Sequence, residues 1–198
     1  MKILVIGATG RTGKHVLTQG AGRGHEITAF ARRPELLTDR SRLADVRQGD
    51  AHDLEAVRAA VQGQDAVLAA VGGSGIASTL ITAMREAGVR RVVMTSSRSV
   101  PATRPRLPVT LAWLFFREVY VDLARAEGML QVSGLDWTIA RATMLNDKPP
   151  AGRVHLDFEA NATGGAMQLS RADYAMALLD AVEDPALIGK ALGICGPK

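Results

Sequence analysis

Short apolar runs alternate with helical patterns along most of this 198-residue chain. Six runs have the β-rich or continuously apolar character of strands covered on both faces, and the least apolar, at 45–49, is assigned from its place in the alternation. They are KILVI (2–6), EITAF (26–30), DVRQG (45–49), DAVLAAV (65–71), RVVMTS (91–96) and DWTIAR (136–141). Helices are expected between them, at 12–24, 53–63, 77–88 and around 110–132. Three of these segments end in glycine, a common helix stop.

The alternation predicts an α/β fold, a doubly wound parallel sheet with right-handed crossovers, formed by residues 1–198 as a single domain. The pattern loosens twice. Residues 97–109 are interpreted as a loop, and 144–169 as excursions around one short strand near 153–158. Both segments follow the carboxyl end of a strand, where open α/β sheets bind ligands. We therefore expect these small C-terminal excursions on the substrate side.

Composition removes several classes of function. The formal net charge is only +4 and the basic residues are scattered, so no nucleic-acid partner is expected. The single cysteine, Cys195, cannot form an intramolecular disulfide and is interpreted as a small apolar residue in a late strand. The histidines show no metal spacing. No signal peptide is recognised, and the longest apolar stretch, 107–116, is about half a membrane span. A cytoplasmic protein with no membrane partner and no metal is expected.

A glycine-rich loop follows the first strand. Gly7, Gly10 and Gly13 are spaced to allow a tight turn, a close approach of the backbone to a phosphate, and tight packing of the next helix. That helix would offer free N–H groups and its positive dipole end to a pyrophosphate. The residues between the glycines, also expected to contact the cofactor, are Thr9, Arg11 and Thr12. The strand–loop–helix context predicts a dinucleotide site.

The second strand ends in two arginines. NAD-selective sites usually place an acidic residue there, to hold the ribose 2′-OH. This chain has Arg32 and Arg33 instead, and a guanidinium suits a phosphate dianion. A solvated basic turn is the alternative interpretation. Because Arg11 adds a third positive charge, NADP(H) is favoured as the cofactor.

Further cofactor contacts are expected after the third, fourth and fifth strands. Asp53 is interpreted as the N-cap of the following helix, whereas Asp50 could face the adenine or cap its own turn. Glycines after the fourth strand would let the backbone lie against the cofactor. The remaining expected contacts are Ala51, Val71, Gly72, Gly73 and Thr95.

These motifs resemble those of the atypical short-chain dehydrogenases/reductases, in particular the NAD(P)-binding group that includes flavin/biliverdin reductases and nitrogen-metabolite-repression regulators. The resemblance covers nearly the whole chain. It rests on GATGRTGKHV, ARRP, GDAHD, RVVMTSS, AEGMLQVSGLDWTIAR and LSRADYAMALLD. Within the last, SRAD (170–173) is interpreted as a structural capping box.

The resemblance also identifies departures from the family. The Tyr-x-x-x-Lys pair of mainstream members falls on Val119 and Leu123, and the adjacent Tyr120 has Ala124 at the lysine spacing. Without that lysine, alcohol oxidation or sugar epimerisation by this route is not expected.

The flavin/biliverdin reductases do without the pair. The resemblance implies a catalytic serine at Ser96 and a histidine where this chain has Met144, and the usual proline is replaced by Ala142. These departures disfavour a specific biliverdin activity. They leave flavin reduction open, because hydride passes between stacked rings and protons can come from solvent.

The expected substrate side combines hydroxyls and aromatic rings. Ser96 and Ser97 could contact the nicotinamide ribose or a substrate carbonyl, or could simply begin a loop. The aromatic residues near the long helix could roof a planar substrate, form a subunit seam or pack in the core. The substrate contacts expected are Ser97, Trp113, Tyr120 and Met144. His155 is interpreted as a surface strand residue, with proton donation the less favoured alternative.

Two functions follow. The first is an NADPH-dependent reductase of a planar conjugated small molecule, flavin-like or quinone-like. The second is a non-catalytic NADP(H)-binding redox sensor acting through a protein partner. Either could be a monomer or a homodimer.

Overall fold

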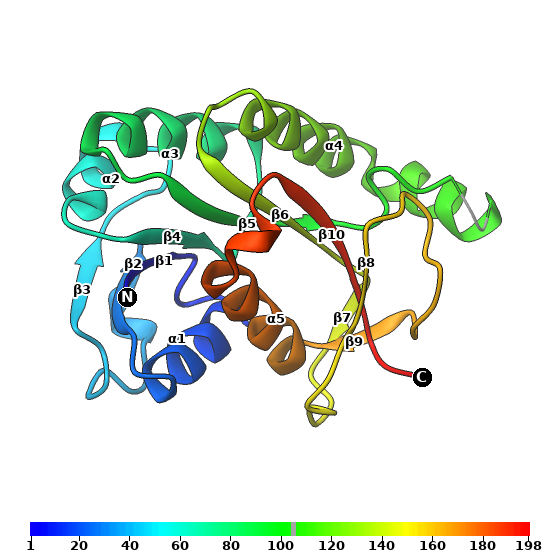
Figure 1. The fold of residues 1–198 in the computed structure, drawn as a ribbon, viewed down its shortest axis with the longest axis horizontal. Coiled ribbons are helices and arrows are strands. Elements are labelled where there is room, and N and C mark those ends of the chain that lie inside the picture. Colours follow the sequence, from blue (N-terminus) through cyan, green and yellow to red (C-terminus); the bar gives the residue numbers. More distant parts are fainter. Residues whose placement is uncertain (104–105) are drawn as a thin grey trace.

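The structure, a computed structural model, describes residues 1–103 and 106–198, with the backbone alone for 106–109 and 112. One sheet runs through the molecule in the order β3-β2-β1-β4-β5-β6-β10-β8 (Figure 1). Its strands are β1 (Lys2–Ile6), β2 (Glu26–Ala31), β3 (Asp45–Gln48), β4 (Ala66–Ala69), β5 (Arg91–Ser97), β6 (Asp136–Ala142), β8 (His155–Asp157) and β10 (Lys190–Cys195). Every pairing is parallel except that of β10 with β8. The doubly wound α/β sheet expected from the sequence is confirmed.

Helices cover both faces of this sheet (Figure 1). On one face lie α1 (Gly13–Gly22) and α5 (Arg171–Glu183). On the other lie α2 (Leu54–Val61), α3 (Ser74–Ala87) and α4 (Arg106–Gln131). The side chains of β1 divide between the two, with Ile3 and Val5 in the α1/α5 core and Leu4 and Ile6 in the α2/α3/α4 core. Burial on both faces explains why the central strands are continuously apolar.

The six strands expected from the sequence are all present, but two helices begin earlier than expected. α3 begins at Ser74, and α4 begins at Arg106, inside the segment interpreted as a loop. Pro108 falls in the first turn of α4, where a missing N–H removes no helical hydrogen bond. Residues 104 and 105 of that expected loop lie outside the described residues, as do the side chains of 106–109 and 112 within the apolar stretch.

The C-terminal excursions contain the strand expected near 153–158, which is β8. They also contain a small parallel sheet, β7 (Met144–Asn146) with β9 (Gln168–Ser170), that was not expected. Ser170 caps α5 by accepting from the backbone N–H of Asp173 at 2.9 Å, which confirms the capping box. Cys195 is buried in β10, as expected. Among the described residues no helix is long and apolar enough to cross a membrane.

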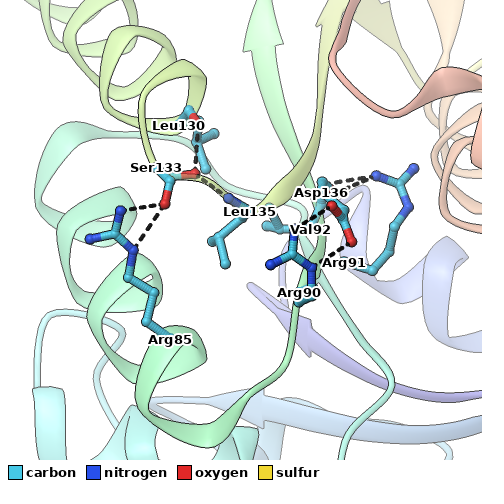
Figure 2. Close-up of polar contacts among 8 residues, drawn as sticks. All are labelled: Arg85, Arg90, Arg91, Val92, Leu130, Ser133, Leu135 and Asp136. Atoms are coloured by element: carbon cyan, nitrogen blue, oxygen red, sulfur yellow. Dashed lines mark hydrogen bonds and ion pairs between the residues drawn. The ribbon is translucent and has the colours of Figure 1, made fainter.

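A polar network closes the amino-terminal edge of the sheet (Figure 2). The buried Arg91 donates to the Asp136 carbonyl at 2.7 Å and to Thr138 Oγ1 at 2.9 Å, and burial lowers its pKa. Arg90 pairs with the Asp136 carboxylate, and Arg85 donates to the Ser133 carbonyl. These arginines are occupied by structural partners, so ligand chemistry is left to the carboxyl edge.

Candidate cofactor and substrate site

The glycine loop joins β1 to α1 with almost no free space. Gly7 has φ +79°, in the left-handed region that favours glycine. A Cβ on Gly13 would lie 2.2 Å from the Gly7 carbonyl oxygen and 2.9 Å from that of Ala8. A side chain at residue 13 would therefore push α1 away from the end of β1. This is the close helix–strand packing expected from the spacing.

The amino end of α1 is left open for an anion. Thr12 stands at its N-cap without a side-chain capping bond, and its first turn holds no acidic residue. The first N–H groups of a helix lack intrahelical acceptors and carry its positive dipole end. The N–H groups of Lys14 and His15 donate to the carbonyls of Gly10 and Thr12, at 3.1 and 3.0 Å, and no side chain caps this end. The positive dipole end beside a loop of glycines fits the pyrophosphate of a dinucleotide.

A pocket of about 580 Å³ opens beside this loop at the carboxyl edge of the sheet. It lies where the strand order reverses between β1 and β4, the usual ligand crevice of doubly wound sheets. Several predicted cofactor residues come together in its wall, namely Gly7, Thr9, Gly10, Arg32, Arg33, Asp50, Ala51, Val71 and Gly72. The sequence reasoning missed other lining residues, among them Phe30, Leu36, Gly49, His52 and Ile76.

Phe30 and Gly49 form an apolar surface within this pocket. A Cβ on Gly49 would lie 2.6 Å from the Phe30 ring, so only glycine lets the backbone rest against that ring. The signal was present in the sequence as an aromatic at the end of β2 and a glycine at the end of β3. Nearby, Asp50 accepts from the His52 backbone at 3.0 Å, and Asp53 caps α2 by accepting from the Glu55 backbone at 3.0 Å. The N-cap role of Asp53 is confirmed, and Asp50 serves as a turn cap while lining the pocket.

Arg32 and Arg33 are both exposed, and both line the same pocket. Among the residues that the structure describes, neither arginine has a carboxylate partner. Several other arginines do form ion pairs with carboxylates, for example Arg47, Arg58 and Arg90. The charges of Arg32 and Arg33 are therefore not neutralised within the chain. Such a pair fits a phosphate dianion at the rim of the pocket.

The third expected cationic contact has a different partner. Arg11 pairs with Asp147, which also pairs with Arg171 at 2.8 Å. This bridge joins the glycine loop, the segment after β7 and the start of α5. Arg11 is outside the lining of the pocket, as are Thr12, Gly13, Gly73 and Thr95.

The turn after β4 is packed against α4. A Cβ on Gly72 would lie 2.5 Å from Leu123 Cδ2, so Leu123 covers this glycine directly. Asp122 accepts from the backbone N–H of Ser74 at 3.2 Å and from its hydroxyl, which anchors α3 to α4. An apolar residue thus occupies the position that the family resemblance assigns to lysine.

Ser96 lies in a buried polar cluster. Its hydroxyl donates to Glu127 Oε1 at 2.6 Å, and Arg141 Nε donates to the same carboxylate at 3.0 Å. The hydroxyl hydrogen of Ser96 is directed at Glu127 in this structure, and the catalytic role expected for this serine stays a prediction. The cluster ties β5 and β6 to α4.

A second buried pair continues the same row of residues across the sheet. The strand register places Ser96 beside Arg141, Arg141 beside Gly193, and Gly193 beside Asp157. Arg98, at the end of β5, reaches over Gly193 to donate to Asp157 Oδ1 at 2.6 Å. The side chains of Arg98 and Asp157 are only 7% and 8% exposed.

The aromatic residues of α4 lie partly open to solvent. Trp113 donates from Nε1 to the Ser99 carbonyl at 2.9 Å and meets Tyr120 edge to face, with 5.4 Å between ring centres. Ser97 accepts from the Ser99 backbone N–H at 3.2 Å, so Ser97 and Trp113 both contact the backbone of Ser99. Phe116, whose ring centre is 6.1 Å from that of Tyr120, breaks the helix with non-helical φ and ψ.

The apolar stretch around this break is exposed within this chain, with Leu114 72% and Phe115 75% accessible. The roof over a planar substrate and the subunit seam both stay predictions. Met144, the other expected substrate contact, is 62% exposed in β7. His155 is half-exposed in β8, which agrees with its interpretation as a strand residue.

The comparisons with known proteins agree with this geometry. A family model described as NAD(P)H-binding matches residues 7–185, from the first glycine of the loop to the end of α5 and beyond. The chain belongs to the NAD(P)H-binding family. The resemblance identified from the sequence motifs is thereby confirmed.

Relatives and similar structures cover nearly the whole chain. The isoflavone reductase homolog A622 of Nicotiana tabacum is 26% identical over 99% of this chain and 68% of its own length. An anaerobillin reductase, ChuY of Escherichia coli O157:H7, superposes with a TM-score of 0.86 at 24% identity, over 100% and 98% of the two chains. A short-chain dehydrogenase/reductase of Veillonella parvula in complex with NADP has a TM-score of 0.83 at 21% identity, over 99% and 94%. At these identities the two structures show a shared fold.

Proposed function

We propose that this protein is an NADPH-dependent reductase of a planar, conjugated small molecule, flavin-like or quinone-like. The observation that carries the cofactor choice is the pair Arg32 and Arg33 in the pocket wall, with no carboxylate partner among the described residues. A 2′-phosphate supplies the missing negative charge, whereas a ribose 2′-OH does not. The complex of a protein of the same fold with NADP is consistent with this choice.

The chain's own residues supply orientation more than acid–base chemistry. The glycine loop and the amino end of α1 would hold the pyrophosphate of a bound cofactor, and Leu123 against Gly72 leaves an apolar wall where a lysine would activate a tyrosine. NADPH supplies hydride. A conjugated acceptor that stacks on the nicotinamide needs no lysine–tyrosine pair, because its protons can come from solvent.

The substrate class draws support from the aromatic side chains and from relatives. Trp113, Phe116 and Tyr120 form a half-exposed aromatic cluster above the loop that follows β5. Aromatic faces suit a planar ligand. One relative is named as an isoflavone reductase homolog, and one protein of similar fold is named as an anaerobillin reductase.

A direct assay tests this function. We expect the wild-type protein to oxidise NADPH in the presence of flavins or quinones. The decay of NADPH absorbance with a panel of these acceptors measures the rate. NADH should be used less well at the same concentration. Tight NADPH binding with no oxidation by any member of the panel would instead favour the redox sensor. The exposed apolar residues Leu114 and Phe115 would then be the surface offered to its protein partner.

The aromatic cluster gives a separable prediction. Trp113→Ala is expected to raise the apparent KM for the acceptor about tenfold, as removal of one stacking face should, while NADPH affinity stays within about twofold. Steady-state kinetics and an NADPH titration measure the two effects. If both are unchanged and the protein shifts from dimer to monomer on size-exclusion chromatography, the stretch is a subunit seam and the substrate role is wrong.

A further inference from the structure

A buried hydroxyl pair lies at the carboxyl end of β5. Tyr174, on α5, is 1% exposed, and its hydroxyl donates to the Ala140 carbonyl on β6 at 2.7 Å. The same hydroxyl oxygen is hydrogen-bonded to Thr95 Oγ1 on β5. Thr95 itself is only partly buried. Tyr174 thus connects the helix beneath the sheet to a hydroxyl at the ligand edge.

The direction of these hydrogen bonds is fixed by the hydrogens available. A tyrosine hydroxyl has one hydrogen, and a carbonyl can only accept. The hydrogen of Tyr174 therefore goes to Ala140, and Thr95 must be the donor in the second bond. With its own hydrogen directed at Tyr174, the Thr95 hydroxyl has only acceptor lone pairs left for any other partner.

This arrangement does not change around neutral pH. Burial raises the pKa of Tyr174, and the hydrogen bonds from Thr95 and from the Ser96 backbone oppose that rise without reversing it. The phenol stays protonated and keeps donating to Ala140.

The position of Thr95 places it beside the cofactor pocket. Ala69 on β4 is in register with Met94 on β5, so Thr95 lies level with Ala70, which lines the pocket. A Cβ on Gly72, another lining residue, would be 2.7 Å from the Thr95 carbonyl oxygen. Since β5 and β2 lie on opposite sides of β1 and β4, Thr95 is at the end of the carboxyl edge away from Arg32. A dinucleotide anchored by its 2′-phosphate would present its nicotinamide here.

We propose that Tyr174 is a positioning residue that fixes Thr95 as a hydrogen-bond acceptor for the carboxamide NH2 of nicotinamide. The carboxamide carries a carbonyl acceptor and an NH2 donor, and an acceptor-only threonine can bind just the NH2 end. The choice sets the orientation of the carboxamide. This inference rests on the proposed NADP(H) function.

The test compares two oxidised cofactors by calorimetry. The 3-acetylpyridine analogue of NADP+ keeps the carbonyl but has a methyl group in place of the NH2 donor. The wild-type protein is expected to bind NADP+ about tenfold more tightly than the analogue, as loss of one well-placed hydrogen bond implies. In Tyr174→Phe the Thr95 hydroxyl has lost its acceptor and can turn its hydrogen toward the carboxamide. The preference for NADP+ over the analogue should then fall to about twofold or less.

Matched variants separate positioning from a structural effect. Thr95→Val should remove the preference as Tyr174→Phe does, and Thr95→Ser should restore it. Adenosine 2′,5′-bisphosphate should bind all four proteins equally, because it reaches only the arginine end of the pocket. If Tyr174→Phe does not fold, the two Thr95 variants still test whether the Thr95 hydroxyl accepts from the carboxamide NH2.

Two results would overturn the inference. A full preference for NADP+ retained in Tyr174→Phe, with NADP+ still bound, rejects the role of Tyr174 while leaving the proposed function intact. An unchanged preference in Thr95→Val rejects the contact with Thr95. Failure of the wild-type protein to bind NADP+ at all would reject the proposed function itself, and this inference with it.

Discussion

Replacing both Arg32 and Arg33 with alanine is expected to weaken NADPH binding about 100-fold and to change NADH affinity by about twofold or less. Both arginines line the pocket and lack carboxylate partners among the described residues, so a 2′-phosphate bound there would be attracted by both charges. NADH carries no phosphate at that position, and its affinity depends on the glycine loop. Parallel titrations of the two cofactors, by calorimetry or fluorescence, measure the difference.

Arg42→Ala is the matched control, because Arg42 is an exposed arginine close in sequence and outside the lining of the pocket. Its loss changes the net charge by one without touching the site, so NADPH affinity should stay within about twofold. Equal loss of NADPH and NADH affinity in the double variant would mean that the arginines shape the loop and do not select the phosphate. Raising the salt concentration should weaken NADPH binding to the wild type more than to the double variant.

Asp157→Asn is expected to lower the free energy of unfolding by about 3 kcal/mol, because it leaves the charge of Arg98 buried without a counter-ion. The pair is almost fully enclosed, and Asp157 also accepts from the backbone N–H groups of Glu159 and Thr163. Denaturant unfolding measures the loss. Asp45→Asn is the control, since Asp45 pairs with Arg47 at the surface and should contribute about 1 kcal/mol or less.

A double substitution separates the cost of a lone charge from the value of the pair. Arg98→Met together with Asp157→Asn removes both charges, so it should be less destabilising than Asp157→Asn alone. Additive losses in the two single variants and the double would contradict this account. They would show that the packing of each side chain matters and their mutual attraction does not.

The pH dependence follows from the same contacts. Burial acts to raise the pKa of Asp157, but the hydrogen bonds from Arg98 and the backbone outweigh it, and the pKa lies below its ordinary value of 3.8. The stability it contributes is therefore fully present above pH 3.8 and is lost as the pH falls through the lower folded value. The stability difference between wild type and Asp157→Asn should shrink over that acidic range.

Much of the fold could be predicted because its signals are local. Five of the six predicted strands are apolar or β-rich runs, and β3 follows from its place in the alternation. Asp53 and Ser170 fulfil their capping roles within three residues of their own positions. The strand β10 and the β7–β9 sheet were not specified in this way. β10 contains Gly193, which packs against Arg98, a residue far away in sequence. β10 pairs with β6 and with β8, and both partners are distant from it in sequence.

The candidate site likewise has a part that could be predicted from local sequence and a part that could not. Residues that directly follow β1 to β4 meet in the pocket because parallel strands end at one edge. The partners of Ser96 and Arg11 could not be predicted, because Glu127 and Asp147 come from segments that sequence patterns do not place beside them. Tyr174 was hidden for the same reason, since a tyrosine within an apolar helix looks like ordinary core.

The placement of α5 has a consequence for how the protein is made. Its side chains Leu178 and Leu179 cover the same core as Ile3 and Val5, although the ribosome adds them some 175 residues later. A nascent chain that has already emerged through β6 has only α1 on this face of the sheet, so the apolar side chains that α5 covers are still exposed to solvent and to other nascent chains. Such an intermediate is prone to aggregate and suits a holding chaperone. The chain can bury this apolar surface by itself only when the segment ending at Glu183 has left the exit tunnel.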